Sequence, residues 1–390
     1  MPDPAGGGPG RRPIGSVAVI SSNAGSLANF RGPLLKAMAA TGRRVHALAP
    51  DYDTETRAAV VACGAEPVDI AMDRTGMHPL RDARDALGLV AVLRRLRPDA
   101  TLGYFIKPVI YGSIAARLAG VPRRFALIPG MGYVFTPGSG REGLKRRVLR
   151  AAVTALYRTG VAACERVFVY NAEDIEQLVA TGIAPRAKLV LLPGTGVDLA
   201  RFAAAPPVPE PRFLLIARLL REKGVAEYAA AARIVRQSHP EAVFDLVGGA
   251  DPNPGAIPLA DVERWAADGD IVWHGHVDDV RPWIARAGVY VLPSYREGKP
   301  RSTQEAMAMA RPIVTTDAVG CRDTVVEGEN GFKVPVGNAP ALAAAMTRFI
   351  DDPALIARMG MASRRIAEAR FDVDRINADL LAAMDMGTPC

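Results

Sequence analysis

The sequence predicts two α/β domains, each built on a parallel β-sheet and facing the other across a cleft. Short apolar runs alternate with helical patterns along the chain, which is typical of strands buried on both faces of a parallel sheet. The alternation stops once, at the proline-rich segment AAAPPVPEP (203–211), and then restarts. A length of 390 residues also suits two domains.

The first half of the chain predicts an N-terminal domain over 14–203. A Gly/Pro-rich stretch, 1–13, precedes it and is expected to be a disordered tail. The pattern at 31–42 predicts a helix that is closed by Gly42. The expected strands are VAVIS (17–21), RVHALAP (44–50), DATLGYF (99–105), RRFALIP (123–129), RVFVYN (166–171) and KLVLLP (188–193).

The second half predicts a C-terminal domain over 212–370, joined by a linker at 204–211. An amphipathic helix is expected within 371–390, and its packing back on the N-terminal domain stays open. Ligands of such sheets bind at the carboxyl ends of the strands, so the cleft should lie at the joint. The expected strands are RFLLIAR (212–218), AVFDLVG (242–248), DIVWHG (270–275), VYVLPS (289–294), RPIVTT (311–316) and GFKVPV (331–336).

The composition indicates a soluble enzyme with an anionic partner. Hydrophobic residues make up 49% and charged residues 23%. The net charge of +7 favours a nucleotide, diphosphate, phospholipid or nucleic acid, with plain solubility as the alternative. The four cysteines form no CxxC pair, so neither a zinc site nor a disulfide framework is indicated, which fits a reducing cytosol. No window of ~18 apolar residues predicts a membrane-spanning helix.

Two cations follow the first strand after the linker. Arg218 ends that strand, and Lys223 stands at the start of the next helical pattern. Fixed positive charge beside a helix N-terminus suits a diphosphate. The alternative is a solvated basic loop.

Two glutamates, Glu297 and Glu305, follow a later strand in SYREGKPRSTQEAMAMA. In one interpretation, Ser302 and Glu305 form a capping box at the start of a helix. In the other, both carboxylates bind hydroxyl groups of a ligand, and Glu305 accepts hydrogen bonds from the two hydroxyls of a ribose.

The spacing Glu-x7-Glu, preceded by Arg-x4-Lys-Gly, resembles the retaining GT-B glycosyltransferases of family 4. The resemblance continues through EAMAMARPIVTTDAVGCRDTVVEGENGFKVPV and covers roughly residues 15–385. YFIKPVIYGSIAARLAGVPRRFALIPGMGYVF (104–135) resembles a narrower branch, the capsule and lipid-linked-oligosaccharide N-acetylhexosaminyl transferases. The resemblance implies a GT-B fold with an N-terminal acceptor-binding domain and a C-terminal nucleotide-sugar-binding domain, both Rossmann-like.

The resemblance also implies roles for individual residues. Arg218 and Lys223 would neutralise the donor diphosphate, and Glu297 would bind the transferred sugar. Many relatives have glycine where this chain has Pro300, which is a small departure from the branch and leaves the placement of the backbone there open. The backbone from Gly298 to Thr303, which includes Pro300, Arg301 and Ser302, would line the sugar and the phosphate. The loop SSNAGSLANF would approach the donor or the acceptor from the N-terminal domain through Gly25 and Ser26.

No general base stands out, and the family chemistry implies none. Retaining enzymes of this kind are thought to deprotonate the acceptor with the leaving phosphate of the donor. The protein would stabilise the charge that grows on the diphosphate, with no metal and no other cofactor.

Other polar positions have a structural role as an alternative to a functional one. Lys107 is expected at a strand end, either meeting an acceptor phosphate or lying on the rim. Asp51-Tyr52-Asp53 is read as a turn rather than a metal motif, and His274-Gly275-His276 as a strand end near the nucleobase pocket. No GxGxxG follows the first strand, which argues against a dinucleotide dehydrogenase.

The segment REGLKRRVLRAAVTALYR (141–158) predicts a basic amphipathic helix. Such a helix can rest on an anionic membrane surface, or it can be a domain helix with a solvated basic face. The first option predicts a cytoplasmic protein held at the inner face of the cell membrane.

The favoured function is transfer of a hexose or N-acetylhexosamine from a UDP-sugar to a polyprenyl-diphosphate-linked glycan precursor. The alternatives are a sugar-nucleotide epimerase of the same fold and a non-enzymatic nucleic-acid binder, for which no binding motif is present. The donor sugar, the acceptor, the linkage and the oligomeric state stay open.

Overall fold

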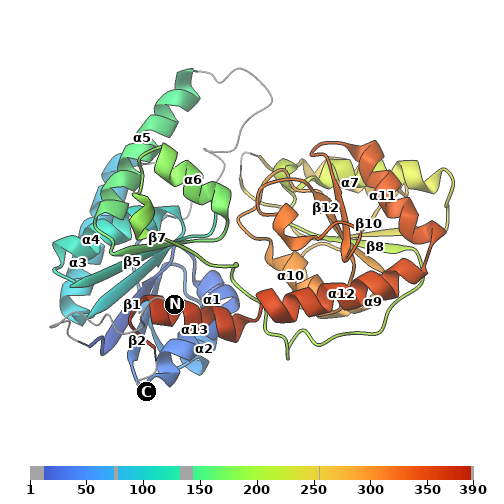
Figure 1. Ribbon diagram of the computed structural model, residues 1–390. Coiled ribbons are helices and arrows are strands. Elements are labelled where there is room, and N and C mark those ends of the chain that lie inside the picture. Colours follow the sequence, from blue (N-terminus) through green and yellow to red (C-terminus); the bar gives the residue numbers. More distant parts are fainter. Residues whose placement is uncertain (1–12, 74–77, 132–143, 254, 388–390) are drawn as a thin grey trace.

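The computed structural model describes residues 13–73, 78–131, 144–253 and 255–387. It shows two α/β domains side by side, each with a parallel sheet between two layers of helices (Figure 1). The predicted fold class is therefore confirmed. Apart from Pro13, the tail predicted at 1–13 lies outside the described residues.

The N-terminal domain holds a seven-stranded parallel sheet in the order β3-β2-β1-β4-β5-β6-β7. Its central strands are buried on both faces, as their continuous apolar runs predicted. The strands are β1 (Ser16–Ile20), β2 (Arg44–Ala49), β3 (Ala65–Asp69), β4 (Ala100–Tyr104), β5 (Arg123–Ile128), β6 (Arg166–Val169) and β7 (Leu189–Leu191).

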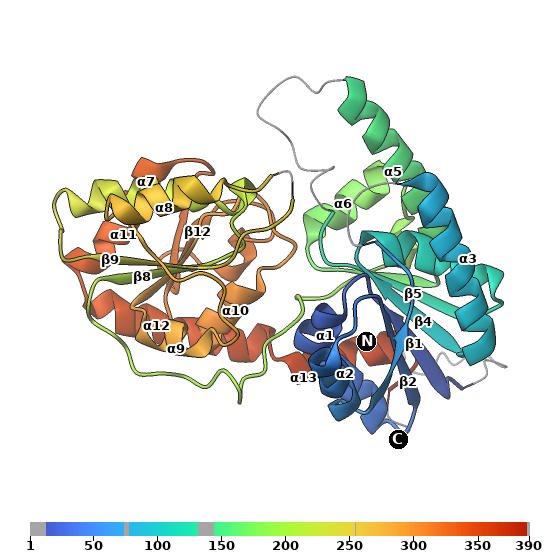
Figure 2. The ribbon, with the colours of Figure 1, turned by 180° about the vertical axis from the view of Figure 1, so that it is seen from behind.

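Helices cover both faces of this sheet (Figure 2). The first two helices pack together on one face, and the third, fourth and fifth helices pack on the other. The bounds are α1 (Ala24–Ala40), α2 (Thr54–Ala62), α3 (Pro79–Leu96), the π-helix η1 (Pro108–Gly112), α4 (Ser113–Leu118), α5 (Leu144–Ala162), α6 (Ala172–Ala180) and the 3-10 turn η3 (Arg186–Lys188).

The C-terminal domain holds a six-stranded parallel sheet in the order β10-β9-β8-β11-β12-β13. All six of its strands coincide with runs that the sequence predicted. They are β8 (Arg212–Ile216), β9 (Val243–Val247), β10 (Val272–Trp273), β11 (Val289–Leu292), β12 (Ile313–Thr316) and β13 (Gly331–Val334).

The helices of this domain also form two layers, with α7 and α11 packed together on one side and α10 and α12 on the other. The bounds are the 3-10 turn η4 (Arg221–Lys223), α7 (Val225–Arg236), α8 (Leu259–Ala267), α9 (Arg281–Arg286), α10 (Arg301–Ala308), the 3-10 turn η5 (Arg322–Thr324), α11 (Ala339–Asp351) and α12 (Ala354–Arg370).

The chain passes between the domains twice. The first crossing is the proline-rich linker, where the buried guanidinium of Arg311 donates to the Pro206 carbonyl at 2.8 Å. The second follows α12 and leads into α13 (Val373–Ala383), which packs against α1. Leu380 and Met384 are buried in the core of the N-terminal domain. The final helix therefore returns to the domain in which the chain begins.

Candidate active site

A cleft of about 960 Å³ lies between the two domains, at the carboxyl ends of both sheets. Its volume suits a small-molecule ligand. The N-terminal wall includes Ser26, Phe30, Phe105 and Lys107; the C-terminal wall includes Arg218, Lys223, Glu297, Pro300, Arg301, Ser302 and Glu305. Most of the site residues that were predicted from the sequence therefore line one cavity.

The two predicted cations lie on the same wall. Lys223 donates to Oε1 of Glu297 at 2.5 Å, and Ser294 donates to the same oxygen at 2.8 Å. Arg218 pairs with Asp251, with 2.8 Å between its guanidinium and Oδ2. The side chain of Arg218 is half exposed, so the guanidinium can also reach a ligand in the cleft.

Gly224 places Lys223 in this wall. Its φ of +70° lies in the left-handed region, and a Cβ at this position would lie 2.1 Å from the Pro293 carbonyl oxygen. Only glycine permits that conformation together with that approach. The turn η4 is therefore held against the end of β11, the strand that leads to Glu297.

The capping-box interpretation of Ser302 and Glu305 is wrong. Helix α10 begins at Arg301, one residue before the expected cap, and has no side-chain cap. Glu305 instead accepts a hydrogen bond from Nε of Arg301 at 2.8 Å. Ser302 accepts one from the hydroxyl of Tyr290 at 2.6 Å. The first turn of α10 is thus left uncapped by side chains beside the cleft.

Glu305 is largely buried but lines the cleft. Burial raises the pKa of its carboxyl group, and the charge of Arg301 opposes the shift. The carboxylate keeps acceptor capacity beyond its bond to Arg301, which suits a pair of vicinal hydroxyls.

Arg301 connects the two walls, a contact that sequence reasoning missed. Its guanidinium donates to the Asn29 carbonyl at 2.7 Å and lies 4.9 Å from the ring centroid of Phe30. The sequence carried no signal for this contact, because the partners are 272 residues apart.

Two residues of the same stretch lie outside the cleft lining. The Gly298 carbonyl accepts a hydrogen bond from Nδ2 of Asn171 at 3.0 Å, across the domain boundary. The side chain of Thr303 is fully buried. These two positions shape the wall from behind, while Pro300 and Ser302 face the cavity.

The loop expected at SSNAGSLANF is largely helical. Helix α1 begins at Ala24, well before the predicted start at residue 31, because Asn23 caps it by accepting the Ser26 N–H at 2.8 Å. Gly25 and Ser26 therefore lie in the first turn of a helix. The hydroxyl of Ser26 lines the cleft and accepts from the hydroxyl of Tyr104 at 3.0 Å.

Lys107 is a buried residue rather than a rim lysine. Its ammonium group lies 2.7 Å from Oδ1 of Asp82, and both side chains are nearly inaccessible. Tyr111 donates to the second oxygen of Asp82 at 3.3 Å. Lys107 still lines the cleft, but it does so as part of a buried ion pair with Asp82 rather than as an exposed cation.

Phe105 is a cleft residue that the sequence did not indicate. Its φ is +74°, a conformation that is costly for a bulky L-residue and that is enriched at functional sites. The ring packs against that of Tyr104, with 4.5 Å between centroids and an angle of 40° between the ring planes. With Phe30 and Ile106 it gives the N-terminal wall an apolar surface.

The motifs discounted as metal sites have other partners. Asp53 caps α2, and Asp51 accepts the Ala24 N–H at 3.0 Å. Nε2 of His274 lies 2.7 Å from the buried Asp245, whereas His276 lines the cleft. Within the described ranges, no group of three or more His, Cys, Asp or Glu residues is arranged to hold a metal ion.

Helix α5 contains most of the predicted basic amphipathic segment; residues 141–143 lie outside the described part. Val153 and Tyr157 face the core, while Val148 is 60% exposed. Arg147 is also exposed. In the part of the chain that the structure describes, no helix has the length and apolar character needed to cross a membrane.

Two family models match the chain, one in each domain. Residues 28–195 match the model described as "Glycosyl transferase 4-like domain", and residues 210–352 match "Glycosyl transferases group 1". The matches lie on either side of the linker.

Curated relatives include two enzymes that act on lipid-linked substrates. The chain is 26% identical over 369 residues to N,N'-diacetylbacillosaminyl-diphospho-undecaprenol alpha-1,3-N-acetylgalactosaminyltransferase of Campylobacter jejuni, covering 90% of this chain and 93% of that protein. It is 24% identical to UDP-Gal:alpha-D-GlcNAc-diphosphoundecaprenol alpha-1,3-galactosyltransferase of Escherichia coli, covering 71% and 72%.

Solved structures share the fold at low sequence identity. Sucrose-phosphate synthase from Thermosynechococcus elongatus superposes with a TM-score of 0.78 at 19% identity, covering 95% of this chain and 98% of that one. Anabaena HepE in complex with UDP and glucose has a TM-score of 0.75 at 16% identity, covering 95% and 99%. The predictions of an enzyme and of the GT-B fold are confirmed, while the epimerase has no support here. The chain belongs to the glycosyltransferases of the GT-B fold, with a glycosyl transferase 4-like domain followed by a glycosyl transferases group 1 domain.

Proposed function

We propose that the protein transfers a hexose or N-acetylhexosamine from a UDP-sugar to a polyprenyl-diphosphate-linked glycan precursor, with retention of configuration at the anomeric carbon. The product would enter a cell-surface polysaccharide or glycan. One observation carries the proposal: two cations, two carboxylates and the uncapped start of α10 line a single cleft between the domains.

The donor fits the C-terminal wall by charge and by hydrogen-bonding capacity. Arg218 and Lys223 match the negative charge of a diphosphate, and the uncapped N–H groups at the start of α10 add to that match. Glu305 accepts the two ribose hydroxyls, and Glu297 accepts hydroxyls of the transferred sugar. Because two side chains already supply positive charge, the proposal requires no metal cofactor.

In the proposed reaction, the proton passes directly from the acceptor to the donor, and no side chain acts as a general base. The bond from the anomeric carbon to the diphosphate oxygen breaks, and the acceptor oxygen bonds to that carbon on the same face. The acceptor hydroxyl proton passes to the departing phosphate oxygen. Arg218 and Lys223 stabilise the charge that develops on the diphosphate. Because this charge is greatest in the transition state, the two cations lower the activation barrier.

The acceptor fits the N-terminal wall. Phe30 and Phe105 offer apolar rings to the face of a sugar, and Lys107, which is paired with Asp82, keeps donor capacity for an acceptor phosphate. The relatives from Campylobacter jejuni and Escherichia coli are named for undecaprenyl-diphosphate-linked substrates, which supports an acceptor of that class.

Contact with the membrane through α5 would bring the cleft to such an acceptor. The first turns of this helix extend away from the rest of the domain (Figure 1), and Val148 and Arg147 are exposed there. An apolar side chain flanked by cations suits the surface of an anionic bilayer. In this proposal the protein is a peripheral protein at the inner face of the cell membrane.

The test combines a panel of UDP-sugars with a synthetic polyprenyl-diphosphate N-acetylhexosamine. We expect release of UDP that depends on the acceptor, and a product whose new glycosidic bond keeps the donor configuration by NMR. A donor that is isomerised without acceptor would indicate the epimerase instead. No UDP release with any donor would overturn the proposal.

A further inference from the structure

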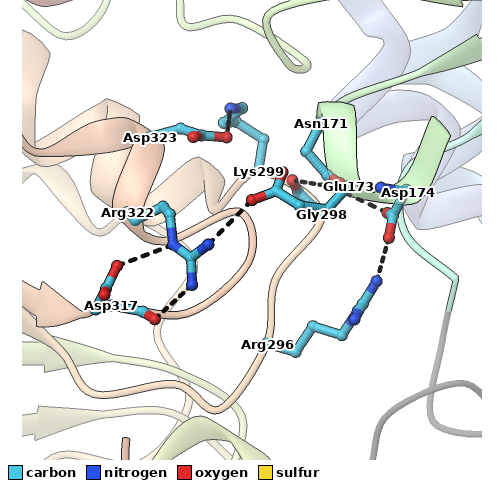
Figure 3. A network of polar contacts seen from close by, with 9 residues as sticks. All are labelled: Asn171, Glu173, Asp174, Arg296, Gly298, Lys299, Asp317, Arg322 and Asp323. Carbon is cyan, nitrogen blue, oxygen red and sulfur yellow. Dashed lines mark hydrogen bonds and ion pairs between the residues drawn. The ribbon is translucent and has the colours of Figure 1, made fainter. Parts of the chain in front are cut away.

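The loop that carries Glu297 is held by the opposite domain. The guanidinium of Arg296 donates to Oδ1 of Asp174 and, at 3.0 Å, to Oε1 of Gln177, both on α6 of the N-terminal domain. The Gly298 carbonyl accepts from Nδ2 of Asn171, the residue that caps α6. Figure 3 shows the contacts of Arg296 with Asp174 and of Gly298 with Asn171. Arg296 and Gly298 are the two neighbours of Glu297 in the sequence.

The N-cap residue of α6, Asn171, holds the side chain of Asp174 in place for its contact with Arg296. Asp174 is fully buried, and Asn171 both accepts its N–H at 2.7 Å and donates to its Oδ2 at 2.9 Å. Burial raises the pKa of Asp174, and the charge of Arg296 acts in the opposite direction. Removing Arg296 would leave a buried carboxylate without its cation, which is costly.

The two domains approach so closely here that only glycine fits. A Cβ on Gly298 would lie 1.4 Å from the Pro129 carbonyl oxygen, at the end of β5. A second ion pair extends the contact, with 3.1 Å between Arg322 of η5 and Glu173 of α6 (Figure 3). The contact between the loop and α6 is therefore made by backbone and by charge.

We infer that Asp174 and Asn171 are positioning residues for Glu297: they hold Arg296 and Gly298, so that the subsite for the transferred sugar is complete only when the two domains are docked. The inference rests on the proposed function, in which Glu297 binds that sugar. Two of the proposed nucleotide contacts do not depend on this loop, because Arg218 follows β8 and Glu305 lies on α10, whereas Lys223 contacts Glu297 itself.

The inference separates turnover from nucleotide binding. A loop displaced by about 1 Å costs up to roughly a hundredfold in rate. If the ion pair served stability alone, its loss would lower the melting temperature and leave kcat unchanged at a temperature well below the transition. A positioning role predicts a lower kcat with a much smaller change in the Kd for UDP, because Arg218 and Glu305 keep their places and only Lys223 contacts the loop.

The test is a double-mutant cycle with Asp174→Asn, Arg296→Gln and the double variant. We expect each single variant to lower kcat about tenfold, and the double variant to lower it by a similar factor rather than by their product, because the two side chains act as one unit. Asn171→Ser adds a milder variant, because serine can still cap α6 but is too short to replace the hydrogen bonds that Nδ2 of Asn171 donates to Gly298 and Asp174. We expect kcat to fall severalfold.

Arg186→Gln is the matched control, because it breaks an exposed ion pair with Glu176, a residue on α6. Arg186 itself lies in the turn η3. Unchanged kcat in Asn171→Ser and in both single variants, with wild-type turnover normal, overturns the inference and leaves the proposed function intact. A wild type without UDP release from any donor removes the proposed function, and the inference with it. Kd for UDP is measured by calorimetry, and a parallel loss of UDP binding in all three would also contradict the positioning role.

Discussion

Lys223 and Glu297 contact each other directly, with 2.5 Å between the ammonium nitrogen and Oε1 of the carboxylate. The sequence nominated the first for a diphosphate and the second for a sugar. In the proposed function, this contact would place the two subsites side by side, as cleavage of the bond between sugar and diphosphate requires.

The first prediction concerns the charge of Lys223. Lys223→Ala removes a cation that stabilises the departing diphosphate, and we expect kcat for UDP release to fall about 10²- to 10³-fold. Arg221→Ala is the control, since Arg221 is an exposed cation in the same turn η4 and does not line the cleft. Equal activities of the two variants would contradict the assignment of Lys223.

The second prediction uses the raised pKa of Glu305. A carboxyl group with a raised folded-state pKa stabilises the fold below its unfolded pKa, and that contribution is lost as the pH rises through the folded pKa. Glu305→Gln cannot ionise, so its melting temperature relative to wild type should be higher at about pH 7 than at about pH 4. Glu329→Gln, at an exposed glutamate, should show no such trend. If the difference in melting temperature between Glu305→Gln and wild type did not change with pH, the raised pKa of Glu305 would be contradicted.

The same carboxylate should give UDP binding a pH dependence. The ionised form accepts more strongly from the two ribose hydroxyls than the protonated form, so UDP affinity should fall as the pH drops through the raised pKa of Glu305. Glu305→Gln should bind UDP more weakly at neutral pH and should lose this part of the pH dependence. Calorimetric titrations of both proteins across this pH range test the prediction, because the titration of UDP itself is common to both.

A fourth prediction separates the ring of Phe105 from its backbone strain. An L-residue in the left-handed region costs roughly 1–2 kcal/mol, and glycine does not. Phe105→Gly should therefore be more stable than Phe105→Ala by about 1 kcal/mol in urea unfolding. Both variants lose the ring, so both should raise KM for the acceptor and leave KM for the donor unchanged. Equal stabilities, or an unaltered acceptor KM in both, would count against this role.

The last prediction addresses the membrane surface. Val148→Ser combined with Arg147→Gln removes an exposed apolar side chain and a cation from α5, and co-sedimentation with anionic vesicles should fall. Val61→Ser on α2 is the control, because Val61 is 58% exposed and Val148 is 60% exposed. Neutral vesicles should bind the wild type weakly. If the double variant sedimented with anionic vesicles as strongly as the wild type, α5 would not be the membrane contact.

The strands were predictable because burial on both faces leaves continuous apolar runs. The exception is β3, an edge strand whose sequence AEPVD includes Pro67 and two acids and carries no such run. The start of α1 was missed because Asn23, and not the later helical pattern, sets where the helix begins.

The candidate site was predictable in part, since residues after the carboxyl ends of parallel strands gather at one edge. The sequence therefore indicated Arg218, Lys223 and Glu297. It could not indicate the pairing of Arg296 with Asp174, because 122 residues separate them and the contact depends on how the domains dock. The positive φ of Phe105 was likewise hidden, because no glycine marks it.

The return of α13 predicts an order of assembly during synthesis on the ribosome. The N-terminal sheet emerges first, but its core lacks Leu380 and Met384 until α13 is translated. The C-terminal domain is complete at α12, before α13 exists. The half that is translated second is therefore the half that can finish folding first, and the nascent N-terminal half must wait with part of its apolar surface uncovered.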